Sequence, residues 1–481
     1  MTPEECSRIN SSLLHRIANN DPNLTYITIA SSPWPYDDDD DEGSGYIGPS
    51  SNDEWAELAR ALGQSRQVKN IMIMEEWEIS AQNLGTLFTG LRSNTSIETM
   101  ILTHSQLRCP LHDFAAFVEN NPRLVDLRIE NCDMRADWMQ HLARALSRGT
   151  VRSITKICIH QQRLNDLALV ELCVALRNHP QLEELNLSCN SPRRQCCAEI
   201  ASMLRNQHSW MKILVLYSCG LSDNECIILA SALVTNKRLM RLNLHSNNIS
   251  HEGMNVVANS LANNASLREL SFESNPGTQN ARGWDAFSRT IGGSGVQTIN
   301  DTYMSNHTLW MVTPGLPGDL ISKLPANVYE FLQLNRNCDK TFVARAKIFK
   351  NHFDGEFDLR LFQSMQATIL PQVLGWVGGD CAVEDVCSDT IGSGNVEGYD
   401  MDSGSDESGI DEAETVDSDG GNDRWQDWWY DNSPLPNGYG VGSYDHYRRL
   451  NISPPRPEFN RLSIIYRIVR HVPLLLIERG A

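Results

Sequence analysis

A motif of spaced apolar residues recurs at an almost constant interval in the middle of the chain. Its clearest copy reads Leu182-x-x-Leu185-x-Leu187-x-x-Asn190. Equivalent segments begin at Met211, Leu239 and Leu267. The successive starting residues lie 29, 28 and 28 positions apart. Self-similarity at such a period predicts a solenoid, in which each copy buries its apolar face against its neighbours.

Each copy of the motif predicts one short strand followed by a turn. Leu185 and Leu187 are two residues apart, so their side chains leave the same face of an extended segment. A polar or small residue closes the motif where the chain turns off the strand, and we expect it to bond backbone groups of the neighbouring coil. These closing residues are Asn190, Cys219, Asn247 and Asn275.

A helix is predicted after each turn. Ser222 and Glu225 form an S-x-x-E capping box, which is typical of a helix start. Ala230 and Leu233 follow, three residues apart on one helical face, and the small alanine lets the helix lie close to the strands.

The motif, with one strand and one helix per 28 or 29 residues, resembles the ribonuclease-inhibitor-like class of leucine-rich repeats. The resemblance implies an α/β solenoid, a horseshoe with a parallel sheet on the concave face and helices outside. We count about nine or ten coils. Leu24-x-x-Ile27-x-Ile29 is the first, irregular coil, and Val296, Ile299 and Asp301 are interpreted as a degraded last one. An amphipathic helix containing Leu13, Leu14 and Ile17 is expected to close the first coil.

Outside the repeats the composition changes several times. We expect a small helical C-terminal cap that is divided by a disordered acidic insertion. The predicted organisation is a leucine-rich-repeat domain at 1–310 with an acidic loop at about 31–52, a helical region at 327–377, an acidic disordered segment at 378–424, a Trp/Pro-rich linker at 425–460 and an amphipathic helix at 461–479.

The net charge of −19 is concentrated in two segments. Residues 378–423 of the acidic insertion carry 15 acidic residues without Lys or Arg, and residues 37–42 carry six more. The rest of the chain is almost neutral, so we expect no nucleic-acid partner. The last apolar segment is too short and too rich in arginine to span a bilayer, so we expect no membrane span.

The cysteine content indicates the cellular compartment in which the protein resides. Thirteen scattered cysteines and the lack of a signal peptide predict reduced thiols in an intracellular location, cytoplasmic or alternatively nuclear. The adjacent pair Cys196 and Cys197 is interpreted as buried packing rather than a redox site.

We find only incomplete catalytic and metal-binding patterns. His251-Glu252 lacks the second histidine of H-E-x-x-H and is interpreted as the first turn of a helix after Ser250. The glycine run at 438–442 follows no predicted strand, and the acidic run at 400–406 lacks the glycine of a calcium loop. The sequence therefore predicts no enzyme activity, no cofactor and no metal site.

The side chains of the residues between the motif leucines are predicted to line the concave face. One row is apolar where polar residues are expected, which favours a protein-binding site unless the C-terminal part of the chain covers it. The predicted partner-binding residues of this site are Ile213, Val215, Tyr217, Arg241 and His245. A second candidate patch near the N-terminal end contains Met72, Met74 and Trp77.

The function that the sequence favours is a non-catalytic scaffold that binds a protein partner of unknown identity. Two alternatives remain open. Repeats plus an acidic segment resemble the GTPase-activating proteins of the Ran-activator type. The segment Leu370-Pro371-Gln372-Val373-Leu374 resembles the start of an F-box, which would suggest a substrate receptor of a ubiquitin ligase.

Overall fold

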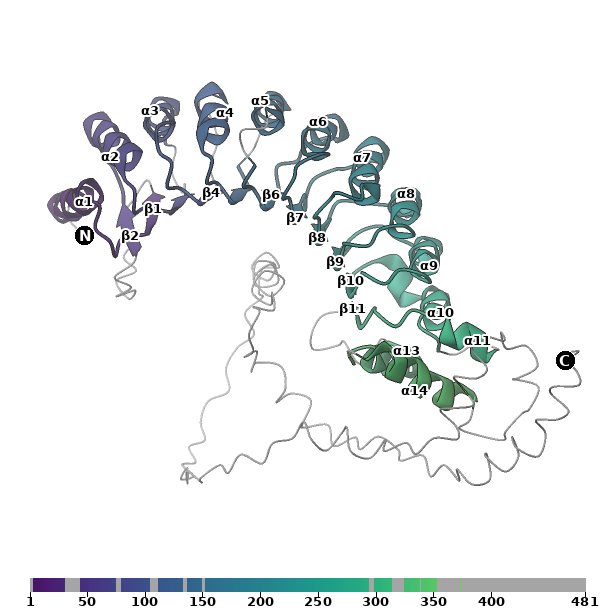
Figure 1. Cartoon of the computed structure of the whole chain (residues 1–481). Helices are drawn as coiled ribbons and strands as arrows, with labels where there is room; N and C mark the ends of the chain where they lie inside the picture. Colours follow the sequence, from purple (N-terminus) through teal and green to yellow (C-terminus); the bar gives the residue numbers. More distant parts are fainter. Residues whose placement is uncertain are drawn as a thin grey trace, which may run out of the picture. The chain divides into compact units, whose positions relative to one another are not determined.

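The computed structural model describes residues 3–30, 44–74, 79–103, 111–132, 136–148, 152–293, 298–313, 324–337, 339–352 and 373. All of them belong to one compact unit. In this unit a layer of strands lines the inner side of an arc and a layer of helices covers the outer side (Figure 1).

The strands form one sheet of eleven members, in the order β11-β10-β9-β8-β7-β6-β5-β4-β3-β1-β2. Every pairing within it is parallel. The strands are β1 (Tyr26–Ala30), β2 (Ser44–Ile47), β3 (Asn70–Met74), β4 (Thr99–Thr103), β5 (Asp126–Glu130), β6 (Lys156–His160), β7 (Glu184–Asn186), β8 (Ile213–Val215), β9 (Arg241–Asn243), β10 (Glu269–Ser271) and β11 (Met311–Thr313).

Helices alternate with these strands along the chain. They are α1 (Pro3–Ala18), α2 (Asn52–Gln64), α3 (Ala81–Leu91), α4 (Leu111–Asn120), α5 (Ala136–Ser147), α6 (Asp166–Leu176), α7 (Arg194–Arg205), α8 (Asp223–Leu233), α9 (His251–Ser260), the 3-10 helix η1 (Pro276–Gln279), α10 (Ala281–Thr290), α11 (Ile299–Tyr303), α13 (Ala326–Leu334) and α14 (Lys340–His352).

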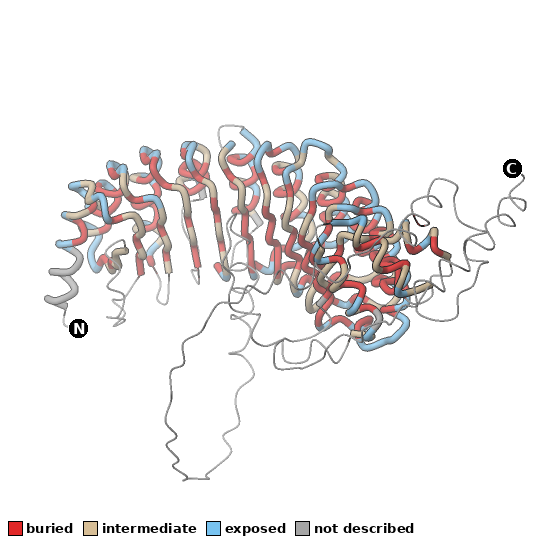
Figure 2. Tube along the Cα trace, turned by 60° about the horizontal axis from the view of Figure 1, so that its bottom comes forward, coloured by how far each residue is buried: buried red, intermediate tan, exposed pale blue. Residues whose placement is uncertain are grey.

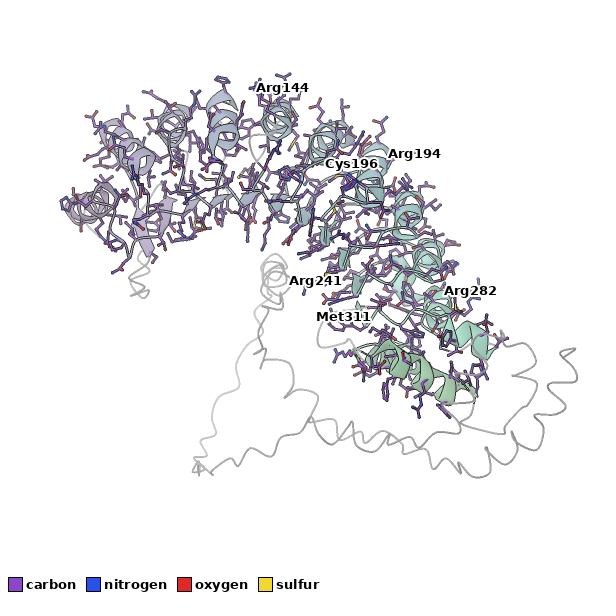
Figure 3. All side chains as sticks on the ribbon, in the orientation of Figure 1. Arg144, Arg194, Cys196, Arg241, Arg282 and Met311 are labelled. Carbon is purple, nitrogen blue, oxygen red and sulfur yellow. The ribbon has the colours of Figure 1, made fainter. Side chains whose placement is uncertain are left out.

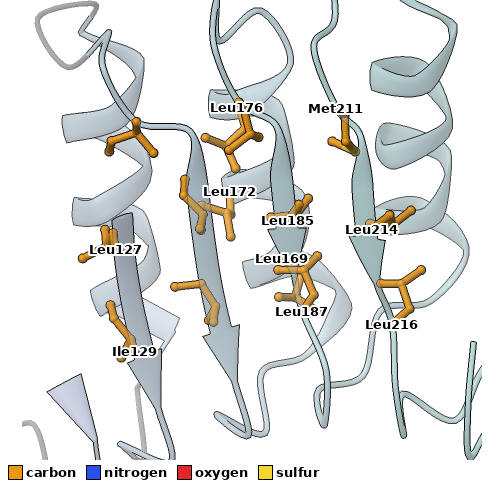
Figure 4. Packing of buried hydrophobic residues seen from close by; sticks show 14 of the residues in the cluster. Leu127, Ile129, Leu169, Leu172, Leu176, Leu185, Leu187, Met211, Leu214 and Leu216 are labelled. Atoms are coloured by element: carbon orange, nitrogen blue, oxygen red, sulfur yellow. The ribbon is translucent and has the colours of Figure 1, made fainter. Parts of the chain in front are cut away.

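The core lies between the two layers. The motif leucines Leu185, Leu214 and Leu270 are 0 % exposed and stand in register along the sheet. Leu169 and Leu172 of α6 face them from the helical side (Figure 4). Figure 2 shows the same arrangement as buried segments that recur from coil to coil. Burial of a leucine side chain contributes about 1.5–3 kcal/mol, so each coil is stabilised mainly by its neighbours.

The asparagines that close the motif bind two coils together, as predicted. Asn247 donates from Nδ2 to the carbonyl of Leu216 in the preceding coil at 2.8 Å and to Leu244 in its own coil at 2.9 Å. Its Oδ1 accepts the N–H groups of Cys219 and Leu221, both at 3.0 Å. One buried amide therefore satisfies four backbone groups at the turn.

A second ladder of asparagines, which the sequence analysis did not identify, precedes the strands. Asn264 donates to the carbonyls of Leu233 and Asn236 in the preceding coil, at 2.8 and 3.1 Å. Its Oδ1 accepts the N–H of Leu267 at 2.8 Å. Equivalent donations come from Asn94, Asn236, Asn306 and Asn335.

The predicted last coil is wrong. Ile299 and Asp301 belong to helix α11, whose start is capped by Thr298 accepting the N–H of Asp301 at 3.0 Å. Val296 lies outside the described residues. The last strand of the sheet is β11, in which Val312 is 3 % exposed and pairs with Leu270. The sheet therefore extends a few residues past position 310.

The predicted acidic loop at 31–52 is also partly wrong. Residues 31–43 lie outside the described residues, but Ser44–Ile47 forms β2, an edge strand parallel to β1. A Cβ at Gly45 would lie 2.6 Å from Leu13 Cδ1, so glycine is required for α1 to pack this closely. Ile47 is 1 % exposed. Helix α1 and strand β2 together close the N-terminal end, and the predicted capping role of Leu13 and its neighbours is confirmed.

Helices α13 and α14 lie at the other end of the stack, beside α10, α11 and β11 (Figure 1). Lys347 of α14 is fully buried and donates to the carbonyls of Asn306, at 2.8 Å, and Ile291. Lys340 donates to the carbonyl of Asn335 at 2.9 Å, where an asparagine of a further coil would otherwise bind. The acidic segment, the Trp/Pro-rich linker and the C-terminal amphipathic helix lie outside the described residues.

Candidate protein-binding face

The concave face carries the strand residues that alternate with the buried motif leucines. Because successive side chains of a strand point to opposite faces, Glu269, Ser271 and Glu273 face away from the core that holds Leu270 and Phe272. Figure 3 shows Arg241 on this inner side of the sheet and Arg194 on the outer, helical side.

Charged residues on this face are paired with one another. Each pair joins a carboxylate to a base on the same or the adjacent strand. The pairs are Asp126–Arg128 at 2.9 Å, Lys156–Glu184 at 3.8 Å, Arg241–Glu269 at 2.9 Å and His245–Glu273 at 3.2 Å. In the three pairs that contain Lys or Arg the charges neutralise each other locally, and uncharged groups remain as the distinguishing contacts.

Burial changes the acidity of two of these carboxyl groups. Desolvation raises the pKa of Glu269, although the neighbouring Arg241 opposes this shift. Desolvation likewise raises the pKa of Glu184, with Lys156 as the main opposing charge. The Arg241 and Glu269 side chains are both 11 % exposed, so removal of one partner would leave a buried charge without compensation.

An aromatic row, Tyr217 and His245 with Glu273 beside them, lies two residues past the ends of the neighbouring strands β8, β9 and β10. The Tyr217 ring stacks on the His245 ring, with centroids 5.0 Å apart and an interplanar angle of 29°. Nδ1 of His245 lies 3.2 Å from Oε2 of Glu273. The backbone N–H of Tyr217 donates to Ser188 Oγ at 3.2 Å. The Tyr217 ring thus packs on His245, its backbone is bonded to Ser188, and the residue is half-buried.

Two polar atoms beside this row have no hydrogen-bond partner. They are Ser271 Oγ and Glu273 Oε1, both buried. A buried polar group without a partner costs about 1–3 kcal/mol, and such groups are uncommon in native proteins.

The predicted partner-binding residues of the concave site differ in how far they are exposed. Ile213, Tyr217 and His245 are half-buried, whereas Arg241 is 9 % and Val215 only 8 % exposed. Val215 therefore offers little surface to a partner in this state.

The N-terminal candidate patch lies on β3. Met72 and Met74 are half-buried there, and Tyr26 of β1 places its hydroxyl 3.1 Å from Met72 Sδ. Trp77 lies outside the described residues. Strands β4 to β7 separate this patch from the Tyr217 row.

The described ranges contain no cluster of three or more His, Cys, Asp or Glu residues able to hold a metal. His251 is the first residue of α9, and Ser250 accepts the N–H of Glu252 at 3.1 Å, so the helix-start interpretation is confirmed. None of the described helices is long and apolar enough to cross a membrane.

The described cysteines are free thiols. Cys196 and Cys197 are 0 % exposed, which confirms their predicted packing role. The Sγ atoms of Cys173 and Cys196 lie 3.8 Å apart. Burial raises the pKa of Cys219 to about 12, and the pKa of Cys197 rises for the same reason, so neither is an activated thiolate.

The repeated motif, the parallel sheet and the helix of each coil define a leucine-rich-repeat protein of the ribonuclease-inhibitor-like class. No family model matches the chain. NACHT, LRR and PYD domains-containing protein 5 of Homo sapiens is 24 % identical over 215 residues, which make up 44 % of this chain and 17 % of that protein. Protein 14 of the same name series, from Mus musculus, is 29 % identical over 146 residues, 30 % of this chain and 14 % of that protein.

Leiomodin-3 of Homo sapiens is 32 % identical over 98 residues, 20 % of this chain and 17 % of that protein. The chain thus spans less than a fifth of the length of these three relatives. Among solved structures, actin-binding site 2 of leiomodin-1 aligns with 42 % of this chain and 90 % of its own, at 17 % identity and a TM-score of 0.27. The tropomodulin C-terminal domain of Caenorhabditis elegans aligns with 35 % of this chain and 92 % of its own, at 15 % identity and a TM-score of 0.23.

Proposed function

We propose that this chain is a non-catalytic scaffold that binds a protein partner on the concave face of its repeats. The observation that carries the proposal is the aromatic row, in which the Tyr217 ring stacks on His245 and His245 lies against Glu273. A ring that is already ordered loses little conformational entropy on binding, which is why tyrosine is common among the residues that dominate interface energies.

The electrostatics of the face also favour a protein partner. Its acidic and basic groups are paired with each other, so no concentration of unpaired positive charge is available for a phosphate backbone. Ile213 and the outer face of Tyr217 supply the apolar contacts, while Arg241 and His245 form a polar surround. The partner is therefore a protein surface with an apolar group that fits beside Tyr217.

We place this function inside the cell, in the cytoplasm or the nucleus, since free buried thiols are typical of reducing compartments. The alternatives, GTPase activation of the Ran-activator type and substrate reception for a ubiquitin ligase, have no specific support among the described residues. The F-box-like segment lies outside them apart from Val373.

The experiment is quantitative affinity capture with the full chain from its own cells. Tyr217→Ala should reduce recovery of the main partner at least tenfold, because the ordered anchor is lost. Arg60→Ala on the outer face of α2 is the matched control and should leave recovery unchanged. Unchanged recovery with folded Tyr217→Ala and Ile213→Asp variants would remove the concave face as the binding site.

A further inference from the structure

Several of the most exposed large apolar side chains among the described residues lie on the outer, helical face of neighbouring coils. The large apolar residues that are more than 45 % exposed on described helices α6 and α8 are Leu167 at 64 %, Val174 at 48 % and Ile227 at 51 %. Val170 of α6 is half-buried beside them. Leu167, Val170 and Val174 are spaced by three and four residues, so they share one face of α6. We call Leu167, Val170, Val174 and Ile227 the outer patch.

The exposed members of the patch, Leu167, Val174 and Ile227, are not part of the core, whereas Val170 is partly buried and packs against it. Helix α6 turns Leu169, Leu172 and Leu176 toward the strands. The outward Val174 is therefore additional to these core contacts. An exposed apolar patch with a polar surround is a common sign of an interaction site.

The neighbouring coils show what the outer face carries elsewhere. On α5 the positions that match Leu167, Val170 and Val174 hold Asp137, Gln140 and Arg144. On α9 the positions that match Ile227 and Ser231 hold Asn255 and Asn259. The outer patch thus begins at α6 and ends at α8.

Helix α7 lies between the two apolar helices and carries small residues at the matching positions. Ala198 stands in line with Val170 and Ile227, and Ser202 in line with Val174. Arg194 and Arg205 are the first and last residues of α7 and lie on the same face as Ala198, roughly 16 Å apart at 1.5 Å per residue. The patch is therefore a row of small and aliphatic groups with an arginine at each end.

The exposed charges around the patch are basic. Between residues 161 and 240, which the structure describes without a gap, the exposed Asp, Glu, Lys and Arg residues are Arg163, Arg193, Arg194, Arg205, Lys237 and Arg238. The acids there are at least partly buried. Glu199 pairs with Arg177, Asp166 accepts the N–H of Cys196 at 2.9 Å, and Glu171 of α6 accepts a hydrogen bond from Gln140 at 3.2 Å. This contrasts with the net charge of −19 for the chain.

From this combination we infer that the outer patch is a second docking surface, and that its occupant is an acidic amphipathic helix of a partner protein. The apolar side of that helix packs over Val170, Val174 and Ile227, with its backbone close to Ala198 and Ser202. Carboxylates about eleven residues apart pair with Arg194 and Arg205, because both helices rise 1.5 Å per residue. An anionic membrane surface is disfavoured, since the chain as a whole carries strong negative charge.

The test is selection of displayed helical peptides of random sequence on the full chain. The comparison variant is Val174→Asp with Ile227→Asp, which alters exposed positions only. Peptides enriched on the wild-type chain should combine acidic residues with an aliphatic stripe of helical spacing, and should bind the double variant at least tenfold more weakly. Arg194→Glu with Arg205→Glu should also weaken them tenfold, while Arg144→Glu on α5 should change binding less than twofold.

Two results would overturn the inference. One is a selection in which no acidic amphipathic sequence is enriched on the wild-type chain over the double variant. The other is binding to phosphatidylserine vesicles that the double variant loses, which would reassign the patch to a membrane surface. Both are independent of Tyr217, so they distinguish this surface from the concave one.

Discussion

At the residue scale, single buried amides decide whether neighbouring coils stay joined. Asn247 satisfies two carbonyls and two N–H groups, and it is 4 % exposed. Water cannot replace such a side chain without opening the turn. The asparagine positions are therefore more sensitive than an equally buried apolar residue that can be repacked.

We predict that Asn247→Ala lowers the free energy of unfolding by about 3 kcal/mol, because several buried backbone groups lose their partners. The measurement is urea denaturation followed by circular dichroism. Asn263→Ala, at an exposed position later in the same coil, should change stability by less than about 0.5 kcal/mol. Equal effects of the two substitutions would contradict the role of Asn247 in joining neighbouring coils.

A second residue-scale prediction concerns acid. Burial, helped by the nearby Lys347, lowers the pKa of His307 to about 4. In the unfolded chain His307 takes up its proton near pH 6.5, so stability falls as the pH drops from about 6.5 to 4 and is fully present above 6.5. His307→Gln should make the melting temperature depend less on pH between about 6.5 and 4. An unchanged pH dependence would contradict the folded-state pKa.

At the element scale, close contacts between helices fix the spacing of the coils. A Cβ at Gly90 of α3 would lie 2.9 Å from Ala59 Cβ in α2, and closer still to the Ala59 carbonyl oxygen. The two helices therefore depend on glycine at this point. The end elements act differently, because α1, β2, α13 and α14 cover the first and last coils of the part of the chain that the structure describes.

We predict that Gly90→Ala destabilises the chain by about 1–3 kcal/mol by pushing α3 away from α2. Thr89→Ala, an exposed change in the same helix, is the control and should be neutral or slightly stabilising. The measurement is the melting temperature of each variant compared with that of the wild type. A Gly90→Ala variant as stable as the wild type would show that the helices tolerate wider spacing.

The elements also show what the sequence could and could not predict. The period at which apolar residues recur located most coils, because Leu185, Leu214 and Leu270 occupy the same position in their coils and are all buried. It missed β11, because an additional helix, α11, lengthens the preceding connection and breaks the period. Asn306, three residues before Leu309, carried the missing signal, since Asn264 precedes Leu267 in the same way.

The candidate sites were harder to predict than the fold. Tyr217 could be placed on the concave face from alternation alone, but its stacking on His245 depends on rotamers and on the distance between strands. The outer patch was not predicted, because an apolar residue on a helix does not by itself show whether it faces the core or the solvent. The exposure of Val174 in the structure, and the polar Arg144 at the matching position of α5, show that Val174 is turned outward.

At the scale of the whole molecule, the stack gives two different surfaces to one chain. The concave face is locally neutral and carries an ordered aromatic row, whereas the outer face over α6 to α8 is apolar and basic. Because they lie on opposite sides of the same coils, both can be occupied together. Loss of binding at one surface should leave binding at the other surface unchanged, as expected for a scaffold that joins partners.

The central claim is that a protein partner contacts the concave face at Tyr217. The most direct measurement is photo-crosslinking in cells, with p-benzoylphenylalanine in place of Tyr217 and, in a second sample, in place of Arg60 on the outer side of α2. We predict a discrete crosslinked protein from position 217 that is absent from position 60. The same adducts from both positions, or none from position 217 in a folded chain, would contradict the account.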